Sequence, residues 1–262
     1  MTDHDFIIEL LCRVDDDMRA VPKHPLAHLY PSEIVTLGLV FALKGVGCRA
    51  FYRWMTRNLS GLFPALPERT RFFRLLKQHH AWITRFFVPP SLIGLIDSYG
   101  IELLHPRRES RSAQQIGRKG RSNHRWIVGG KVCVLLNHLG LVVNWACDTA
   151  NVYDGLAFQG LVNSVSDQMI VFADASFALK DHRPAHLKIC KRGQWDTRMM
   201  VETMLSMLTV VCHFKHLTHR VWAYFEMRLA FVLALFNILV QWAGLTPDAD
   251  GIVHLSVAPF SL

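Results

Sequence analysis

The sequence lacks paired cysteines, an export signal and a long apolar run, and each absence excludes a class of protein. Its six cysteines are scattered without a Cys-x2-Cys pair, which excludes a zinc ribbon or disulfide framework and fits a reducing compartment. The first residues, MTDHD, are acidic where a signal peptide is basic, so we expect no export signal. The most apolar stretch, residues 229–242, contains Asn237 and Gln241 and is shorter than the roughly 20 residues that span a bilayer. We expect a buried core helix there, no membrane, and a cytoplasmic protein.

Common nucleotide and hydrolase motifs are also missing, and acidic residues are few. We find no phosphate loop, nucleophile elbow or dinucleotide fingerprint. The 29 Lys and Arg residues outnumber the 21 Asp and Glu residues, which gives a net charge of +8 and a pI of about 9.4. This balance favours a polyanionic partner, with nucleic acid ahead of an anionic membrane surface. The 262 residues, 51% of them hydrophobic, can bury one large core or two smaller ones.

Residues 1–90 are expected to form a helical DNA-binding domain. Apolar periodicity and helix signals predict helices over residues 32–43, 48–57 and 68–87, with a linker at 88–91. Between positions 19 and 90, eleven basic residues face only two acids. Helical spacing places Arg49, Arg53 and Arg57 on one face and Arg71, Arg74 and Lys77 on the next. A helix-turn-helix-like DNA module is the functional interpretation, and an ordinary solvated helix face is the alternative.

Two apolar strands after position 90 each end on a carboxylate. Residues 92–96 end on Asp97, and residues 169–173 end on Asp174. If the strands are parallel neighbours, their carboxyl ends bring the two carboxylates together, and Mg²⁺ prefers such oxygen ligands. We therefore predict a divalent metal site there. The alternative is that each aspartate only forms the turn after its strand.

Residues 105–125 form a basic loop with Ser, Gly and Gln between the charges. Glu109 is the only acid in the loop. Such a loop cannot build a core and suits a phosphate backbone, whereas a disordered solubilising loop is the alternative. The basic residues are Arg107, Arg108, Arg111, Arg118, Lys119, Arg121 and Arg125.

The remaining pattern predicts an α/β domain over residues 91–246, followed by a tail over 247–262. Asp154 is expected to cap its helix rather than act as a catalytic acid. Glu202 lies on the helix after Asp174. The order predicts a mixed sheet with helices on both faces, with the first strand beside the strand that ends on Asp174. The expected elements are a hairpin of strands 126–136 and 139–148, a helix over 154–165, a short strand over 187–191 and a helix over 195–211.

These residues resemble the DDE transposases of bacterial insertion sequences, which have a ribonuclease H-like fold. The order Asp97, Asp174, Glu202 is that of the family's three acids. The string Trp195-x2-Arg198-x3-Glu202 is similar to the family signature Tyr-x2-Arg-x3-Glu-x6-Lys, with Trp195 in place of Tyr and Thr209 in place of Lys. The resemblance covers residues 92–242 and also includes Asn151-x2-Asp154, Arg228-Leu229 and Asn237.

The resemblance implies two-metal phosphoryl transfer on double-stranded DNA. Asp97, Asp174 and Glu202 would hold two Mg²⁺ ions, with Mn²⁺ as a substitute. Arg198 would hold Glu202 or a phosphate, and an ordinary ion pair on the helix is its alternative. Trp195 would stack on a base, whereas Thr209 removes one contact to the terminal DNA. The resemblance also implies a homodimer on paired DNA ends and a bacterial protein associated with the nucleoid.

Three other interpretations compete with a transposase. A catalytically inactive or domesticated DNA-binding relative is one, although all three acids are present. A nuclease of the same fold that only hydrolyses DNA is the second. The third is a zinc site at His213, His216 and His219 near Cys212, whose helical spacing spreads the rings and leaves no fourth ligand. His79 and His80 are expected at the surface.

Overall fold

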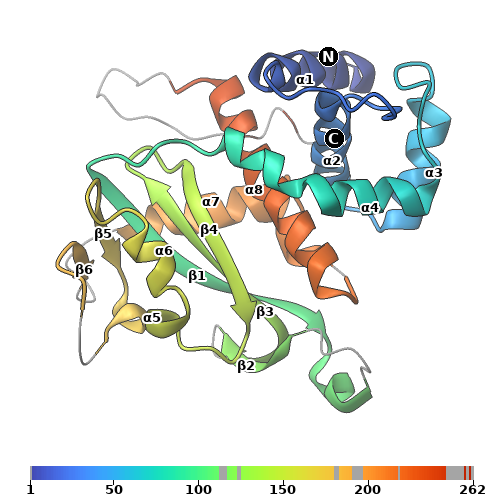
Figure 1. The fold of residues 1–262 in the computed structure, drawn as a ribbon. Helices are drawn as coiled ribbons and strands as arrows, with labels where there is room; N and C mark the ends of the chain where they lie inside the picture. The colour runs from blue at the N-terminus through green and yellow to red at the C-terminus, as the bar shows by residue number, and fades with distance from the viewer. Residues whose placement is uncertain are drawn as a thin grey trace.

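The protein is a mixed α/β fold with a curled sheet flanked by helices and further helices at the amino terminus (Figure 1). The computed structural model describes residues 2–111, 117–122, 125–179, 183–190, 197–217, 219–245, 257 and 260. This arrangement confirms the predicted α/β class and the amino-terminal helices.

The amino-terminal part contains the helices α1 (Asp3–Met18), α2 (Pro31–Lys44), α3 (Cys48–Asn58) and α4 (Arg69–His79). The predicted helix over residues 68–87 instead changes at His80 into the 3-10 helix η1 (His80–Phe86). Glu68 is the N-cap of α4, and its carboxylate accepts hydrogen bonds from the backbone of Thr70 and Arg71 at 2.9 and 3.3 Å. Gly45, with a φ of 62°, ends α2 in the left-handed conformation that glycine adopts without strain.

Six strands form the sheet: β1 (Ile93–Leu104), β2 (Arg118–Ser122), β3 (Arg125–Asn137), β4 (Val142–Thr149), β5 (Ile170–Ala173) and β6 (Leu187–Ile189). β1 pairs antiparallel with β3 and parallel with β5, and β6 extends the parallel part. The other edge of β3 pairs with β2 at its start and with β4 along the rest. The predicted hairpin and the predicted neighbourhood of the two aspartate-bearing strands are therefore confirmed.

Two sequence predictions about this sheet are wrong. β1 does not end at Asp97 but continues to Leu104, because β3 pairs with it along nearly its whole length. Part of the basic loop is not a loop, because residues 118–122 form the edge strand β2. An edge strand is held by backbone hydrogen bonds, so a charged sequence can form one. The remainder includes the 3-10 helix η2 (Pro106–Arg111), and residues 112–116, 123 and 124 lie outside the described residues.

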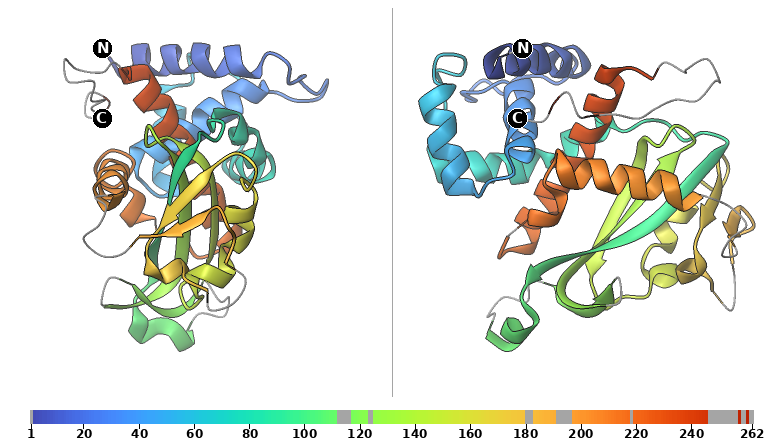
Figure 2. Two further views of the ribbon diagram at one scale, coloured as in Figure 1. Left: turned by 90° about the vertical axis from the view of Figure 1, so that its left-hand side faces the viewer. Right: turned by 180° about the vertical axis from the view of Figure 1, so that it is seen from behind.

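Short and long helices cover opposite faces of the sheet (Figure 2). α5 (Asp154–Ala157) and α6 (Gln159–Asn163) cover one face, whereas α7 (Thr197–Val210) covers the other. We call these faces the α5 side and the α7 side. A short 3-10 helix, η3 (Ala175–Phe177), follows β5, and η4 (Phe214–His216) follows α7. The single predicted helix over 154–165 is thus two short helices.

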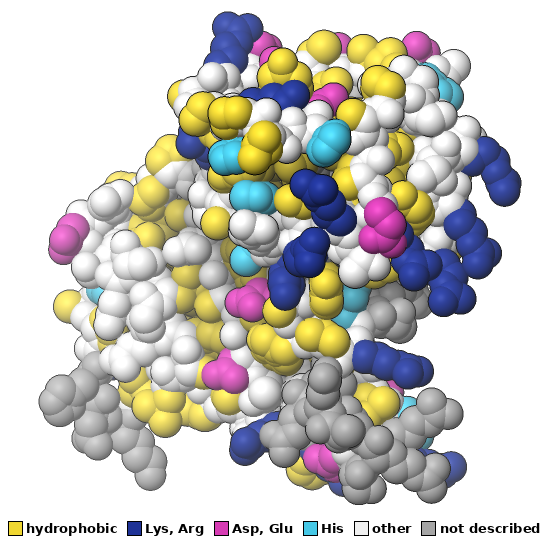
Figure 3. Space-filling view, turned by 45° about the vertical axis from the view of Figure 1, so that its right-hand side comes forward, with side chains coloured by type: hydrophobic (Ala, Val, Ile, Leu, Met, Phe, Trp, Pro, Cys, Tyr) yellow, Lys and Arg dark blue, Asp and Glu magenta, His cyan; other side chains and the backbone are white. Residues whose placement is uncertain are grey.

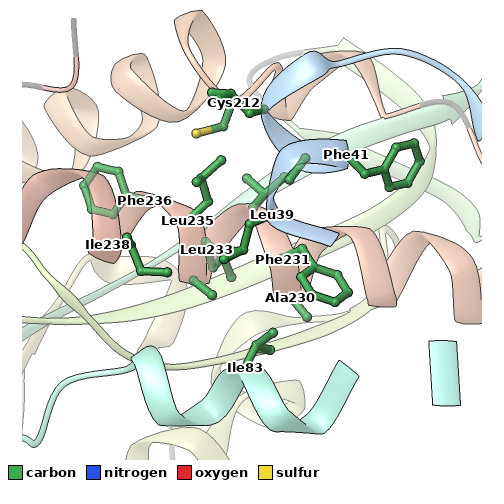
Figure 4. Close-up of a cluster of buried hydrophobic side chains, with 14 of the residues drawn as sticks. Leu39, Phe41, Ile83, Cys212, Ala230, Phe231, Leu233, Leu235, Phe236 and Ile238 are labelled. Carbon is green, nitrogen blue, oxygen red and sulfur yellow. The ribbon is translucent and has the colours of Figure 1, made fainter. Parts of the chain in front are cut away.

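The largest hydrophobic core joins the amino-terminal helices to the α7 side of the sheet through α8 (Trp222–Ala243). Figure 4 shows Leu233 and Phe231 of α8 beside Leu39 of α2, with Ile83 of η1 below them. α2 and α8 approach so closely that a Cβ on Gly38 would lie 2.4 Å from the Phe231 ring. α8 is long and apolar enough to cross a membrane, but 83% of an apolar 18-residue stretch of this helix is buried inside the protein. This burial is what the sequence predicted for a core helix.

Candidate functional site

Asp97 and Asp174 lie on the same side of the sheet, at the same level of neighbouring strands. Ile96 pairs with Ala173 in the parallel register, so each aspartate is the next residue along its strand. Both of these apolar residues belong to the core on the α5 side. Because side chains alternate along a strand, the two aspartates point to the α7 side, and adjacent strands lie only about 4.8 Å apart. The fold therefore places Asp97 and Asp174 at neighbouring positions on adjacent strands.

The two aspartates differ in their surroundings. Asp97 is half-buried, and one of its oxygens accepts a hydrogen bond from the Ser98 backbone N–H at 2.7 Å. Asp174 is exposed and is the N-cap of η3, where its Oδ1 accepts hydrogen bonds from the backbone at 2.9 Å and the hydroxyl of Ser176. Asp174 thus does form the turn of the alternative interpretation. The turn occupies Oδ1, so this role and a metal-binding role use different parts of one carboxylate.

Glu202 lies on α7, the helix that covers the side of the sheet to which both aspartates point. Val201, Met204 and Leu208 bury the inner face of α7, and Glu202 is exposed next to that face. Within the described residues, no three His, Cys, Asp or Glu side chains are close enough together to hold a metal ion. The fold therefore places Glu202 on the predicted helix, and the described residues do not form a three-ligand cluster.

The signature around Glu202 is only partly described. Trp195 lies outside the described residues, and the structure gives the backbone but not the side chain of Arg198. Thr209, which replaces the family lysine, donates its hydroxyl to the Leu205 carbonyl oxygen of its own helix at 2.7 Å. Thr209 therefore turns back onto α7 rather than outward.

A buried ion pair on the α5 side was missed by the sequence analysis. The Lys131 ammonium group lies 2.7 Å from Asp154 Oδ1, and the side chains are only 12% and 7% exposed. Lys131 also donates to the Val152 carbonyl oxygen at 3.0 Å, and the Ser98 hydroxyl donates to Asp154 Oδ2 at 2.9 Å. Because Ser98 follows Asp97, this network fixes β1 directly beside the candidate site. A lone lysine within the apolar strand β3 was the signal in the sequence.

The network also corrects the role predicted for Asp154. Tyr153 occupies the N-cap position, and Asp154 is the first residue of α5. A buried lysine needs a counter-charge, and this need directs the carboxylate into the protein rather than to the helix end. Burial raises the pKa of the neighbouring Cys133 thiol well above its usual value, with the charges of Asp154 and Asp97 adding to the effect. The raised pKa favours the protonated thiol of Cys133.

Two basic surfaces flank the fold. In α3 and α4, the arginines at the predicted positions 49, 53, 57, 71 and 74 are all exposed. None of the ion pairs recorded between described side chains involves an arginine of α3 or α4. Figure 3 shows Lys and Arg side chains gathered on the right-hand side of the upper part of the molecule, whereas acidic side chains lie mainly along its top.

The second basic surface lies around β2 and the start of β3. Arg118, Lys119 and Arg121 are exposed on β2, and the Lys119 ammonium group lies 5.7 Å from the Trp126 ring. Arg125 is exposed and approaches Glu102 at 3.9 Å. Arg107 is also exposed, whereas the structure does not describe the side chains of Arg108 and Arg111.

Among the described side chains near Cys212, which include His213 and His219, no group of three could hold a metal ion. Burial and the charge of Arg228 lower the pKa of His219 to about 4, and burial raises the pKa of the Cys212 thiol to about 12. His213 adopts a left-handed backbone conformation with a φ of 52°. The His216 side chain is not described.

Comparisons with known proteins do not assign the chain to a family. No family model matches the sequence, and a search of curated proteins finds no match.

Proposed function

We propose that this protein is a DDE-type transposase with a ribonuclease H-like catalytic domain, which cleaves and joins DNA strands at the ends of an insertion sequence. The pairing of Asp97 and Asp174 on one side of a parallel strand pair carries the proposal. If the short edge strand β2 is set aside, the acids lie on the first strand, after the fourth strand and on the following helix. This is the order that the resemblance implies.

The donor set suits magnesium. Asp97, Asp174 and Glu202 offer only carboxylate oxygens, which are the ligands that Mg²⁺ prefers. Two bound Mg²⁺ ions, or Mn²⁺ in their place, supply activation of a water or 3′ hydroxyl and stabilisation of the leaving oxygen. Glu202, which is exposed on α7, would be the third member of the set. The Lys131–Asp154 pair holds the Ser98 segment of β1, so Asp97 keeps its orientation.

The basic surfaces supply the affinity for DNA. Exposed arginines on α3 and α4, without an ion pair among the described side chains, can replace the counterions of a phosphate backbone. The β2 surface lies near the last residues of β1, whereas the amino-terminal helices lie beyond its first residues (Figure 1). One duplex can therefore contact both basic surfaces only if it runs along the sheet. A homodimer on paired DNA ends, in the bacterial cytoplasm at the nucleoid, is part of this proposal.

The decisive experiment compares two matched substitutions of glutamate by glutamine. Glu202→Gln should eliminate Mg²⁺-dependent strand transfer while DNA affinity and folding stay unchanged. Glu226→Gln, on the half-buried part of α8, is the control and should retain activity. Cleavage and joining of labelled DNA ends measure both variants. An active Glu202→Gln beside an inactive Glu226→Gln would show that α7 is not the catalytic helix.

One observation supports a second candidate function. The described residues contain no completed three-ligand group, which favours a DNA-binding relative without catalysis. Such a protein would bind DNA with unchanged affinity in Mg²⁺ and in a chelator, and would produce neither nicks nor joined strands. A hydrolytic nuclease would instead produce nicks without joined products, so one gel separates the three functions.

A further inference from the structure

A cavity in the amino-terminal helical part lies apart from the three acids and has the features of a ligand site. Its volume is about 400 Å³, and it is enclosed by the segment between α1 and α2 on one side and by α4 and η1 on the other. Leu26, at its rim, is 80% exposed, which is unusual for a leucine. Figure 3 shows several histidines beside hydrophobic and basic side chains on the upper part of this face. A pocket of this size accommodates a small ring system with a substituent.

Two aromatic rings that stack on each other belong to the lining of the cavity. The rings of His79 and Trp82 lie 4.2 Å apart with an angle of 11° between their planes. Trp82 packs against the main core and is thereby held in place. Burial lowers the pKa of His79, which favours the neutral imidazole. A neutral, fixed stack suits a planar aromatic ligand better than a flexible acyl chain.

The remaining lining residues provide polar groups and one cationic side chain. Gln78 offers both donors and an acceptor, and the exposed His24 and His28 add ring nitrogens. Arg71 lines the cavity, is exposed and takes part in no ion pair recorded for the described side chains. The described residues of the lining include no carboxylate, which disfavours a metal ion or a cationic ligand.

We infer that this cavity binds a single unstacked nucleotide, with the base against the Trp82–His79 stack and the phosphate against Arg71. The combination of a stacked aromatic pair, hydrogen-bonding groups and one cation matches the parts of a nucleotide. The exposed arginines of α3 and α4 lie on the same helical part, so a duplex bound there can place an extruded base at the mouth. To the extent that DNA supplies the nucleotide, the inference rests on the proposed function.

The test uses two duplexes that differ in one nucleotide. One duplex is fully paired, and the other carries a single unpaired 2-aminopurine. We expect the protein to bind the unpaired probe roughly 5- to 150-fold more tightly, which is the range that stacking of one base on an aromatic side chain supplies. The 2-aminopurine fluorescence should be quenched on binding. Trp82→Ala should remove both effects, whereas Trp82→Phe should keep most of the preference.

Two further variants control for folding and for general DNA affinity. Arg71→Gln changes an exposed side chain, so the fold is kept, and it should weaken the unpaired probe more than the paired one. Trp126→Ala removes a tryptophan that is 59% exposed on β3, away from the cavity. It should change the affinity for both probes alike and leave their ratio intact.

Free 2-aminopurine deoxynucleoside 5′-monophosphate distinguishes the two sources of the ligand. Binding of the free nucleotide that depends on Trp82, without a preference between duplexes, supports the site and assigns a free nucleotide to it. Equal affinity for both duplexes and no Trp82-dependent binding of the free nucleotide overturn the inference. Conversion of a dimer to a monomer by Leu26→Asp, with no effect on either probe, also overturns it, because a second copy would then fill the cavity.

The measurements need neither metal nor cleavage. Asp97→Asn should therefore keep the full preference for the unpaired probe. Lost cleavage with an intact preference contradicts only the proposed transposase activity. A lost preference with intact cleavage contradicts only the nucleotide site.

Discussion

The two sides of the sheet hold carboxylates in different ways. On the α5 side, the Asp154 side chain is 7% exposed and lies 2.7 Å from the ammonium group of Lys131. On the α7 side, Asp97 is half-buried and Asp174 is exposed. A carboxylate that is neutralised inside the protein stabilises the fold but is closed to substrate. Carboxylates that are more exposed contribute less to folding.

The largest effect is expected when the negative charge of Asp97 on the α7 side is removed. Asp97→Asn should reduce Mg²⁺-dependent cleavage by roughly 10³-fold or more, because it removes several kcal/mol of charge stabilisation in the transition state. DNA affinity should stay nearly unchanged, since the substitution leaves both basic surfaces intact. Timed cleavage assays and fluorescence anisotropy on the same preparation measure the two quantities. Cleavage at a near wild-type rate would contradict the role of Asp97 as a metal ligand.

Neutralising the α5 side should have the opposite result. Asp154→Asn leaves the buried Lys131 charge without its partner, which should lower the free energy of unfolding by about 3–5 kcal/mol. Urea unfolding followed by circular dichroism measures this loss. The double variant Lys131→Met/Asp154→Leu removes both charges and should recover most of the stability. If Asp154→Asn were as stable as the wild type but inactive, Asp154 would belong to the reaction instead.

The predictable part of the fold came from burial. The apolar runs before Asp97 and Asp174 predicted that two strands lie side by side, and the parallel register confirms it. The apolar run at 229–242 likewise predicted a core helix, and α8 is buried. In these segments the side-chain pattern alone determines the position, because apolar side chains have to leave water.

The parts that the sequence did not reveal depend on distant partners. The end of β1 is set by β3, and the strand β2 forms through backbone pairing that its basic side chains do not indicate. The pairing of Asp154 with Lys131 requires a helix end and a strand to meet. The cavity beside Trp82 likewise exists only once the segment before α2 packs near α4. The local periodicity of the sequence contains no information about such contacts between distant segments.

The buried His219 side chain should make the stability of the protein depend on pH. Burial and the Arg228 charge lower the pKa of His219 from 6.5 to about 4. Between these values the unfolded chain binds a proton that the folded protein does not bind, so stability is lost as the pH falls from 6.5 toward 4. The loss attributable to His219 should reach roughly 3 kcal/mol. His219→Gln should flatten this part of the curve in urea unfolding at pH 4.5 and 6.5, and an unchanged slope would contradict the assignment.

The smallest expected effect concerns the charges on β2, where the structure refines the prediction. Alternation along the strand places Lys119 and Arg121 on one side and Arg118 on the other. One duplex should therefore contact only the first two. The variant Lys119→Ala/Arg121→Ala should reduce the slope of log affinity against log salt by about 1.8, the value for two duplex phosphates.

Adding Arg118→Ala to this double variant is the control that tests the geometry of the edge strand. Because Arg118 projects from the opposite side, the triple variant should show the same salt slope as the double variant. Anisotropy titrations from 50 to 200 mM salt resolve the difference, since a slope change of about 1.8 corresponds to a roughly tenfold difference in affinity over that range. A total reduction of the slope by about 2.7 in the triple variant would mean that all three side chains reach phosphates, as a flexible loop would allow. The salt slope therefore distinguishes a rigid basic edge from a mobile basic loop.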